Sequence, residues 1–153
     1  MVNQFKFTRV DSFFDDINRE DCFDTRDMDG VSPNYKFILV SNCPSDIELC
    51  LDEDGTLDDE TVEIIDTDGA EDGLCSLLYT QGVNGERSIS INDSTVTYDL
   101  GEDAVNINGI FLANVGNGSG YVIAYCIFDK TITESGSLIL PCNGLVWSIR
   151  YGS

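Results

Sequence analysis

The sequence predicts an all-β protein with antiparallel strands, packed as a β-sandwich or a jelly-roll-like fold. Short apolar runs dominate the chain, and several alternate between apolar and polar residues. Turn residues recur about every 8–12 residues, which is the spacing typical of sandwiches and barrels. Strands do not alternate with helical patterns, so a parallel sheet is not expected. The chain has 153 residues, 42% of them hydrophobic, and this is enough for one domain with its own core.

The N-terminal segment, residues 1–35, carries few strand signals and is predicted to be a partly irregular arm. A single β-sandwich domain is expected over 36–153. One helical turn is expected within 11–20, capped by Asp11 or Ser12. Aromatic residues are frequent in the arm, and they could anchor it on a neighbouring subunit or belong to the domain's own core. The candidate interface residues, including one at the C-terminus, are Phe5, Phe7, Phe13, Phe14, Phe23 and Tyr151.

Strands in the first half of the domain are expected on both sides of polar turns. Residues 36–42 and 46–52 flank Cys43-Pro44-Ser45 and are predicted to form a hairpin. Residues 61–65 and 74–80 flank an Asp- and Gly-rich turn, and these two strands are expected to bury Ile64, Ile65, Leu77 and Leu78.

The alternation of apolar and polar residues is clearest in the next two segments. Residues 87–92 and 95–100 are separated by Asp93-Ser94 alone, which predicts a tight hairpin between them. The most apolar strands follow in the last third of the chain, at 104–115, 121–128, 137–141 and 145–151.

The segment "YVIAYCIF", 121–128, is apolar at both its odd-numbered and its even-numbered positions, apart from its tyrosines. A strand of this kind is buried on both faces. It could be the central strand of a sandwich, or a second subunit could cover one of its faces.

Charge is the most unusual property of the chain. Eight Lys and Arg against 28 Asp and Glu give a formal net charge of −20. Thirteen acidic residues and no basic ones lie between Asp46 and Asp72. Direct binding to nucleic acid or to an anionic membrane is not expected, because both require clustered Lys and Arg. The acidity could select basic partners, keep an abundant protein dispersed, or reflect adaptation to high salt.

The spelling Asp-x-Asp-Gly, a fragment of an EF-hand calcium loop, occurs three times, ending at Gly30, Gly55 and Gly69. An EF-hand loop also needs an oxygen ligand at position 1 and a bidentate Glu at position 12. With the glycines at position 6, these positions fall on Thr25 and Lys36, on Cys50 and Thr61, and on Ile64 and Cys75. None of the three fragments therefore completes an EF-hand.

A weaker calcium site of another kind could use Asp66, Asp68, Glu71 and Asp72. The plainer interpretation is a β-turn, because Asp bonds its own backbone and Gly adopts positive φ. We expect no metal and no cofactor, and we expect the carboxylates of the turn Asp66–Gly73 to face solvent or a basic neighbour.

Catalytic residues are not evident in the sequence. The chain has no His, and its basic residues are too scattered to activate a cysteine nucleophile. We therefore expect a protein that is not an enzyme. No signal peptide or long apolar span is recognised, so synthesis in a cytoplasm with reduced cysteines is expected. Cys75 and Cys126 are expected to act as small hydrophobic residues.

The segment 109–149 resembles the C-terminal portion of small structural proteins of tailed bacteriophages. The resembling features are "GIFLANV", a Gly-rich turn, "YVIAYCIFD", a polar linker and "SLILPCNGLVWSI". The resemblance implies paired strands of a β-sandwich or jelly-roll, in proteins that decorate the head or attach to the tail. It carries over no catalytic residue and does not extend to the first hundred residues.

The expected function is therefore that of a virion structural protein, a capsid decoration or minor capsid subunit. Its partners would be other virion proteins of the capsid or neck, in an oligomeric assembly formed in the host cytoplasm. The alternative is a carbohydrate-binding β-sandwich module, with or without the assistance of calcium.

Overall fold

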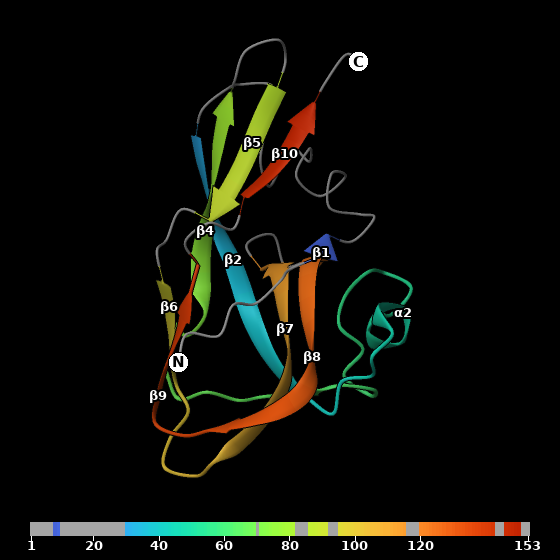
Figure 1. Cartoon of the computed structure of the whole chain (residues 1–153), viewed down its shortest axis with the longest axis vertical. Coiled ribbons are helices and arrows are strands. Elements are labelled where there is room, and N and C mark those ends of the chain that lie inside the picture. Colours follow the sequence, from blue (N-terminus) through green and yellow to red (C-terminus); the bar gives the residue numbers. More distant parts are fainter. Residues whose placement is uncertain are drawn as a thin grey trace.

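The computed structural model describes residues 8–9, 30–69, 71–81, 86–91, 95–115, 120–142 and 146–150. Over these residues the protein is all-β, with antiparallel, curled sheets and one short helix, which confirms the predicted class (Figure 1). The elements are β1 (Thr8–Arg9), β2 (Gly30–Ser41), α2 (Ile47–Cys50), β3 (Glu63–Ile64), β4 (Leu74–Gln81), β5 (Glu86–Ile91), β6 (Thr95–Asp99), β7 (Val105–Asn114), β8 (Val122–Glu134), β9 (Ser137–Pro141) and β10 (Val146–Arg150).

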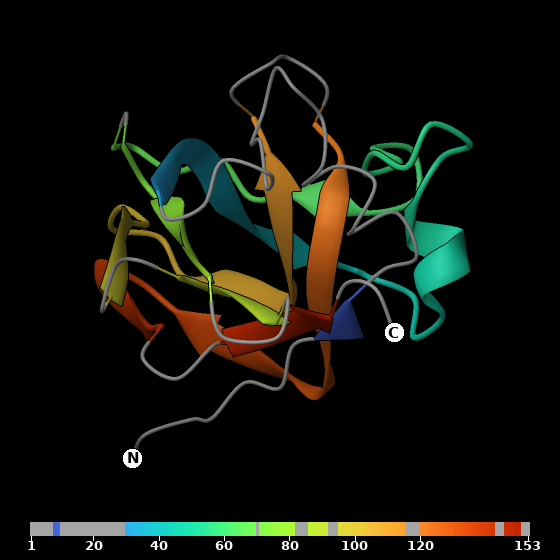
Figure 2. The ribbon, with the colours of Figure 1, turned by 90° about the horizontal axis from the view of Figure 1, so that it is seen from above.

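The larger sheet has the strand order β1-β8-β7-β2-β4-β5-β10, with β3 pairing the end of β2. All of its strand pairs are antiparallel. The sheet is curled rather than flat, as the view from above shows (Figure 2). A shift in register between Ser32 and Tyr35 interrupts the pairing of β2 with β4, and bulges of this kind increase strand bending.

A second, two-stranded sheet pairs β6 with β9. Its inward residues alternate as the sequence predicts for β6, where Val96 and Tyr98 are buried between exposed neighbours. Leu100 is also buried, just beyond the end of the strand. The small sheet packs against one face of the larger sheet.

The main core lies between the two sheets. Side chains from β2 and β7, among them Phe37, Leu39 and Leu112, pack with Val96 and Leu140 of the small sheet. These five residues are at most 4% exposed. Burial of this much apolar surface is the main source of stability for the sheet pair.

The opposite face of the larger sheet is also covered. Val40 of β2 and Phe111 of β7 point to this face, where they pack with Cys43, Cys50 and Val62. The last three residues belong to the segment 42–62, which we call the acidic lobe and which contains α2. The central strands are therefore buried on one face by the small sheet and on the other by the acidic lobe.

This arrangement explains why β8 is apolar on both faces at its start. Val122 packs in the core under the acidic lobe, and Ile123 packs in the core under the small sheet. Both are completely buried within the chain. Residues Tyr125 to Phe128 are half-buried. Burial of Val122 and Ile123 therefore needs no second subunit, as expected of a central strand.

The predicted strand at 46–52 is wrong, because α2 occupies its centre. Asp46 caps the helix by accepting a hydrogen bond from the Glu48 N–H at 3.0 Å. The alternation of Ile47, Leu49 and Leu51 suggested a strand, but the helix exposes Leu49 and buries Cys50. The acidic lobe therefore replaces the predicted hairpin.

The predicted hairpin between 87–92 and 95–100 is also wrong. β5 pairs with β4 and β10, whereas β6 pairs with β9 in the other sheet. The strands themselves are correctly placed, but the chain crosses between sheets at the short connection. Burial of Ile64 is the third wrong expectation, since this residue of β3 is 41% exposed while Ile65 turns toward the core.

The N-terminal segment contributes to the larger sheet. Thr8 and Arg9 of β1 pair with Tyr125 and Ala124 of β8, and β2 already begins at Gly30. β2 thus runs through the predicted boundary at residue 35 as one strand. The candidate interface residues all lie outside the described residues: Phe5, Phe7, Phe13, Phe14, Phe23 and Tyr151.

Candidate functional site

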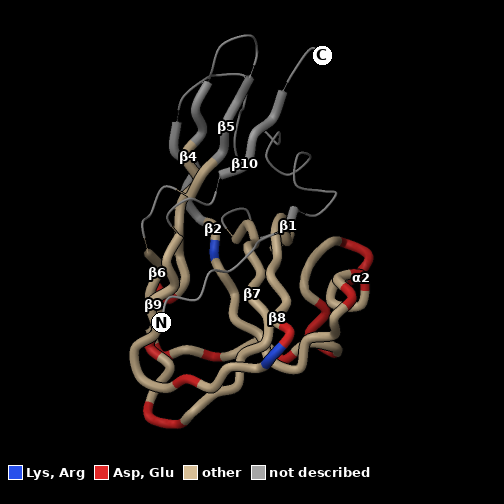
Figure 3. Tube along the Cα trace, viewed as in Figure 1, with Lys and Arg blue, Asp and Glu red and all other residues tan. Residues whose placement is uncertain are grey.

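Among the described residues, Asp and Glu gather on the acidic lobe and on the loops below the two sheets (Figure 3). Besides the lobe, the acidic residues lie on the turn 66–73, which we call the acidic turn, and on the loop that contains Glu102 and Asp103. Lys130 lies on β8. This concentration of negative charge is the candidate functional surface of the described residues.

Part of this charge organises the backbone of the lobe. The Asp52 carboxylate accepts hydrogen bonds from the Asp54 N–H at 2.9 Å, the Thr56 N–H at 3.1 Å and the Thr56 hydroxyl at 2.6 Å. The bonds from Thr56, with those from nearby N–H groups, lower the pKa of Asp52. Asp58 plays the same role for Glu60 N–H and the Thr61 hydroxyl. These carboxylates build turns, which is the plainer interpretation that the sequence suggested.

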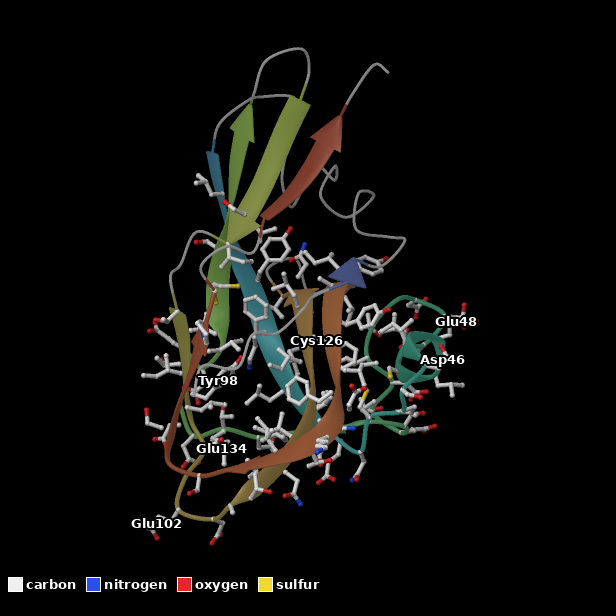
Figure 4. All side chains as sticks on the ribbon, viewed as in Figure 1. Asp46, Glu48, Tyr98, Glu102, Cys126 and Glu134 are labelled. Carbon is white, nitrogen blue, oxygen red and sulfur yellow. The ribbon has the colours of Figure 1, made fainter. Side chains whose placement is uncertain are left out.

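Other carboxylates of the lobe point outward. Asp46 and Glu48 lie on the outer side of α2, away from both sheets (Figure 4). Asp59, Glu60 and Asp54 are exposed as well. Their carboxylates are therefore accessible to solvent.

Asp72 is different, because it is only 7% exposed. Its carboxylate accepts hydrogen bonds from the Gly69 N–H at 3.0 Å and from the Asp99 N–H at 2.9 Å. Burial opposes ionisation, but these bonds, a hydrogen bond from Thr67 and the charge of Lys36 outweigh it and lower the pKa of Asp72. Asp72 therefore ties the acidic turn to β6 as a carboxylate, instead of facing solvent.

The four candidate calcium ligands do not share one orientation. Asp66, Asp68 and Glu71 are exposed, whereas Asp72 is buried and engaged by backbone donors. The Asp68 N–H donates to the Asp99 carbonyl at 2.9 Å, so the turn runs alongside β6. Within the described residues, no group of three or more His, Cys, Asp or Glu is arranged to hold a metal ion.

The three Asp-x-Asp-Gly copies have different structural causes. Gly55 adopts a φ of +83°, the conformation expected of a turn glycine. Gly69 has no such φ, but a Cβ there would collide with the Asp72 carboxylate. Gly30 opens β2 and pairs with Tyr79. The same four-residue motif therefore lies in three different backbone settings. Of its three glycines, only Gly55 has the expected positive φ.

A buried hydroxyl joins the acidic turn to both sheets. The Tyr98 hydroxyl donates to the Phe37 carbonyl at 2.6 Å, while the Phe37 N–H donates to the Gly73 carbonyl at 2.9 Å. The Gly73 N–H in turn donates to the Thr97 carbonyl at 3.0 Å. Burial raises the pKa of Tyr98, so it stays a neutral donor.

Most of the described cysteines are buried as small apolar residues. Cys75 is 6% exposed, in agreement with its predicted role, while Cys126 is half-buried. Cys43 and Cys50 lie on the inner side of the acidic lobe, where burial raises the pKa of both thiols. A raised pKa leaves little thiolate at neutral pH, so these two are poor nucleophiles as they stand.

Two features of this region were not visible in the sequence. Nothing distinguished Asp72 from the other acidic residues of its turn, although its position just before Gly73, at the entry to β4, is a weak signal. The contact of Cys43 with Cys50 was hidden by the wrong strand assignment, because an extended strand over 46–52 would have carried Cys50 away from Cys43, whereas α2 keeps the two sulfurs adjacent. In the described part of the chain, no helix is long and apolar enough to span a membrane.

Comparisons with known proteins supply no relative for this chain. No protein-family model, no curated protein and no solved structure matches it.

Proposed function

We propose that the protein is a structural component of a tailed bacteriophage virion, a capsid decoration or minor capsid subunit that binds other virion proteins. The single observation that carries this proposal is the strand pattern of residues 109–149, which resembles the C-terminal portion of such proteins. Two further observations are compatible with it, namely the arrangement of these strands and the distribution of charge.

The pairing of the strands in the resembling segment is compatible with the proposal. β7 and β8 form an antiparallel pair across the Gly-rich connection, and β9 follows at Ser137–Pro141. β9 leaves the larger sheet and pairs with β6. The resembling segment therefore contributes strands to both sheets.

The charge distribution suits a position on the outside of a particle. Exposed carboxylates gather on the acidic lobe and the neighbouring loops, and the whole chain carries a net charge of −20. A subunit of this charge would be repelled by packaged DNA and attracted by a basic protein surface. We therefore propose that the acidic lobe and the neighbouring loops meet solvent or a basic virion protein.

The test is mass spectrometry of purified virions from the phage that encodes the chain. The proposal expects the protein at a stoichiometry comparable to that of known head or neck proteins, and it expects loss of the protein from particles of a deletion phage. Absence from intact virions, with the protein present in the cell lysate, would contradict the proposal.

A pair of variants tests the predicted interface residues. Phe13→Ser combined with Phe14→Ser should reduce incorporation into particles without lowering the melting temperature, if these residues contact a partner. A lowered melting temperature would instead place them in the domain's own core. Ile139→Ser is the matched control, because this residue of β9 is 61% exposed and lies outside the proposed interface.

A further inference from the structure

Two buried sulfur atoms lie next to each other within the acidic lobe. The Cys43 Sγ and the Cys50 Sγ are 3.1 Å apart, and both thiols are within hydrogen-bonding distance of the Pro44 carbonyl. Cys43 is 8% exposed and Cys50 is fully buried. A disulfide has a sulfur–sulfur distance of about 2.05 Å, so the two atoms need to approach by about 1 Å to bond.

The backbone of each cysteine is held in place independently of the sulfur contact. Asn108 of β7 accepts from the Cys43 N–H and donates to the Cys43 carbonyl, both at 2.9 Å. The Cys50 carbonyl accepts from the Asp58 N–H at 2.9 Å. The packing of Val62 and Phe111 closes the same cluster. The fold itself therefore sets the separation of the two sulfurs.

The segment between the two cysteines is a weak point of the lobe. α2 has four residues, far fewer than a helix needs to be stable alone, and Leu49 on its outer side is 58% exposed. The cap from Asp46 and the cluster of buried residues hold it to the larger sheet. A covalent link between its two ends would remove much of the freedom of this segment in the unfolded chain.

We propose that Cys43 and Cys50 are a site of reversible disulfide formation, which closes the segment 43–50 into a covalent loop within the acidic lobe when the protein leaves a reducing compartment. The inference does not depend on the virion function proposed above. The co-reactant is a low-molecular-weight disulfide, such as oxidised glutathione.

The exchange proceeds in two steps. One cysteine thiol loses its proton to solvent, and the resulting thiolate attacks a sulfur of the glutathione disulfide. This breaks the glutathione S–S bond, forms a mixed disulfide and releases one glutathione thiolate, which takes up a proton. The second cysteine thiolate then attacks the protein sulfur of the mixed disulfide and expels the second glutathione. In total, two protein thiols are oxidised and one glutathione disulfide is reduced to two thiols.

Burial controls the rate of this reaction. Oxidised glutathione reaches neither sulfur unless residues 43–50 open locally, and the raised pKa of each thiol keeps thiolate scarce. Oxidation of the native protein is therefore slow, and closure of the mixed disulfide by the neighbouring thiol is fast because the two sulfurs are already adjacent.

The experiment incubates the folded protein in glutathione buffers of increasing oxidised fraction, quenches with acid and maps disulfides by mass spectrometry. Cleavage at Asp and Glu is needed, because no Lys or Arg lies between Lys36 and Arg87, whereas Asp46 and Glu48 separate the two cysteines. The expected result is a Cys43–Cys50 linkage with loss of two hydrogen atoms from the intact mass. The melting temperature should rise by ~5–10 °C on oxidation.

Cys43→Ala and Cys50→Ala should each abolish the linkage and the rise in melting temperature, while Cys126→Ala, at a half-buried position on β8, should keep both. If either alanine variant fails to fold, the disulfide map of the unmodified protein still decides the question. The proposal is overturned if the oxidised native protein keeps both thiols free, or if Cys43 or Cys50 pairs predominantly with another cysteine.

Discussion

At the scale of single residues, the chain uses a few of its many carboxylates to build structure and leaves the others exposed. Asp72 shows the difference most clearly. Its carboxylate is the acceptor for two partly buried backbone N–H groups, one in the acidic turn and one at the end of β6. Asp66 and Glu71 in the same turn have exposed side chains. The difference is one of position in the fold, because the residue types are equivalent.

Replacement of Asp72 tests this role. Asp72→Ala should lower the free energy of unfolding by about 1–3 kcal/mol, because it leaves two partly buried N–H groups without their acceptor. Asp72→Asn keeps one carbonyl acceptor and should cost less. Urea denaturation measures both, with Asp66→Ala as the exposed control, for which a change within about 0.5 kcal/mol is expected. If Asp66→Ala lowered the free energy of unfolding as much as Asp72→Ala, Asp72 would have no special role within the acidic turn.

The pH dependence follows from the direction of the pKa shift. Since the pKa of Asp72 is lowered in the folded protein, its contribution to stability is fully present above its ordinary pKa of 3.8 and is lost as the pH falls through the lower folded pKa. The difference in the free energy of unfolding between the native protein and Asp72→Asn should therefore be smaller at about pH 3 than at about pH 5. A constant difference between the two at both pH values would show that Asp72 does not titrate with folding.

Gly69 and Gly136 illustrate two different reasons why a position requires glycine, namely lack of space for a Cβ and a positive φ. Gly69→Ala places a methyl group against the Asp72 carboxylate and should cost about 2–3 kcal/mol by displacing that carboxylate from its donors. Gly136→Ala has open space around it but a φ of +71°, so it should cost only about 1–2 kcal/mol. Thermal unfolding of the two variants compares these costs, and a smaller loss at Gly69 would argue that the acidic turn adapts to the methyl group.

At the scale of elements, the larger sheet is stable because both of its faces are covered. The small sheet β6–β9 covers one face and the acidic lobe covers the other. The two covers differ in kind, because the small sheet contributes strands with alternating burial, whereas the lobe contributes a few apolar residues held by polar turns. The lobe is therefore the element with less apolar burial and the first expected to open.

The joint between the sheets is tested by Tyr98→Phe. This change removes one hydroxyl and leaves the Phe37 carbonyl without its donor at the buried contact, which should cost about 1–2 kcal/mol. Tyr125→Phe is the matched control on β8, where the ring is half-buried and stacks near Phe111 at 6.4 Å between centroids. Chemical denaturation of both variants is the measurement. Equal effects at Tyr98 and Tyr125 would remove the special role of the Tyr98 hydroxyl.

At the scale of the whole molecule, self-repulsion of a net charge of −20 opposes the compact state. Raising NaCl from about 0.05 M to about 0.5 M shortens the range of charge interactions, so the melting temperature should rise by ~3–8 °C. A variant with four exposed carboxylates of the lobe neutralised should gain less from salt; the changes are Glu53→Gln, Asp54→Asn, Asp59→Asn and Glu60→Gln. Folding only in molar salt would instead support adaptation to high salt, and no effect of salt would show that the charges are already far enough apart.

By itself, the sequence determined the all-β class, the positions of most strands and the acidity of one part of the chain. These properties are local, because alternation, turn residues and composition act within a few neighbouring residues. The resemblance that supports the proposed function was also contained in the sequence. The strands at 104–115 and 137–141 lie close to their predicted bounds for this reason.

Only the tertiary structure decided which strands pair and what the acidic residues do. β6 pairs with β9 and not with β5, and α2 lies within the segment 46–52 that was predicted to be a strand. In both cases burial in the two cores outweighs the local preference for a hairpin. The same long-range contacts select Asp72 as a buried acceptor and bring Cys43 beside Cys50. Such contacts join residues that are distant in sequence or obscured by an ambiguous local pattern, so no single stretch of the chain could show them.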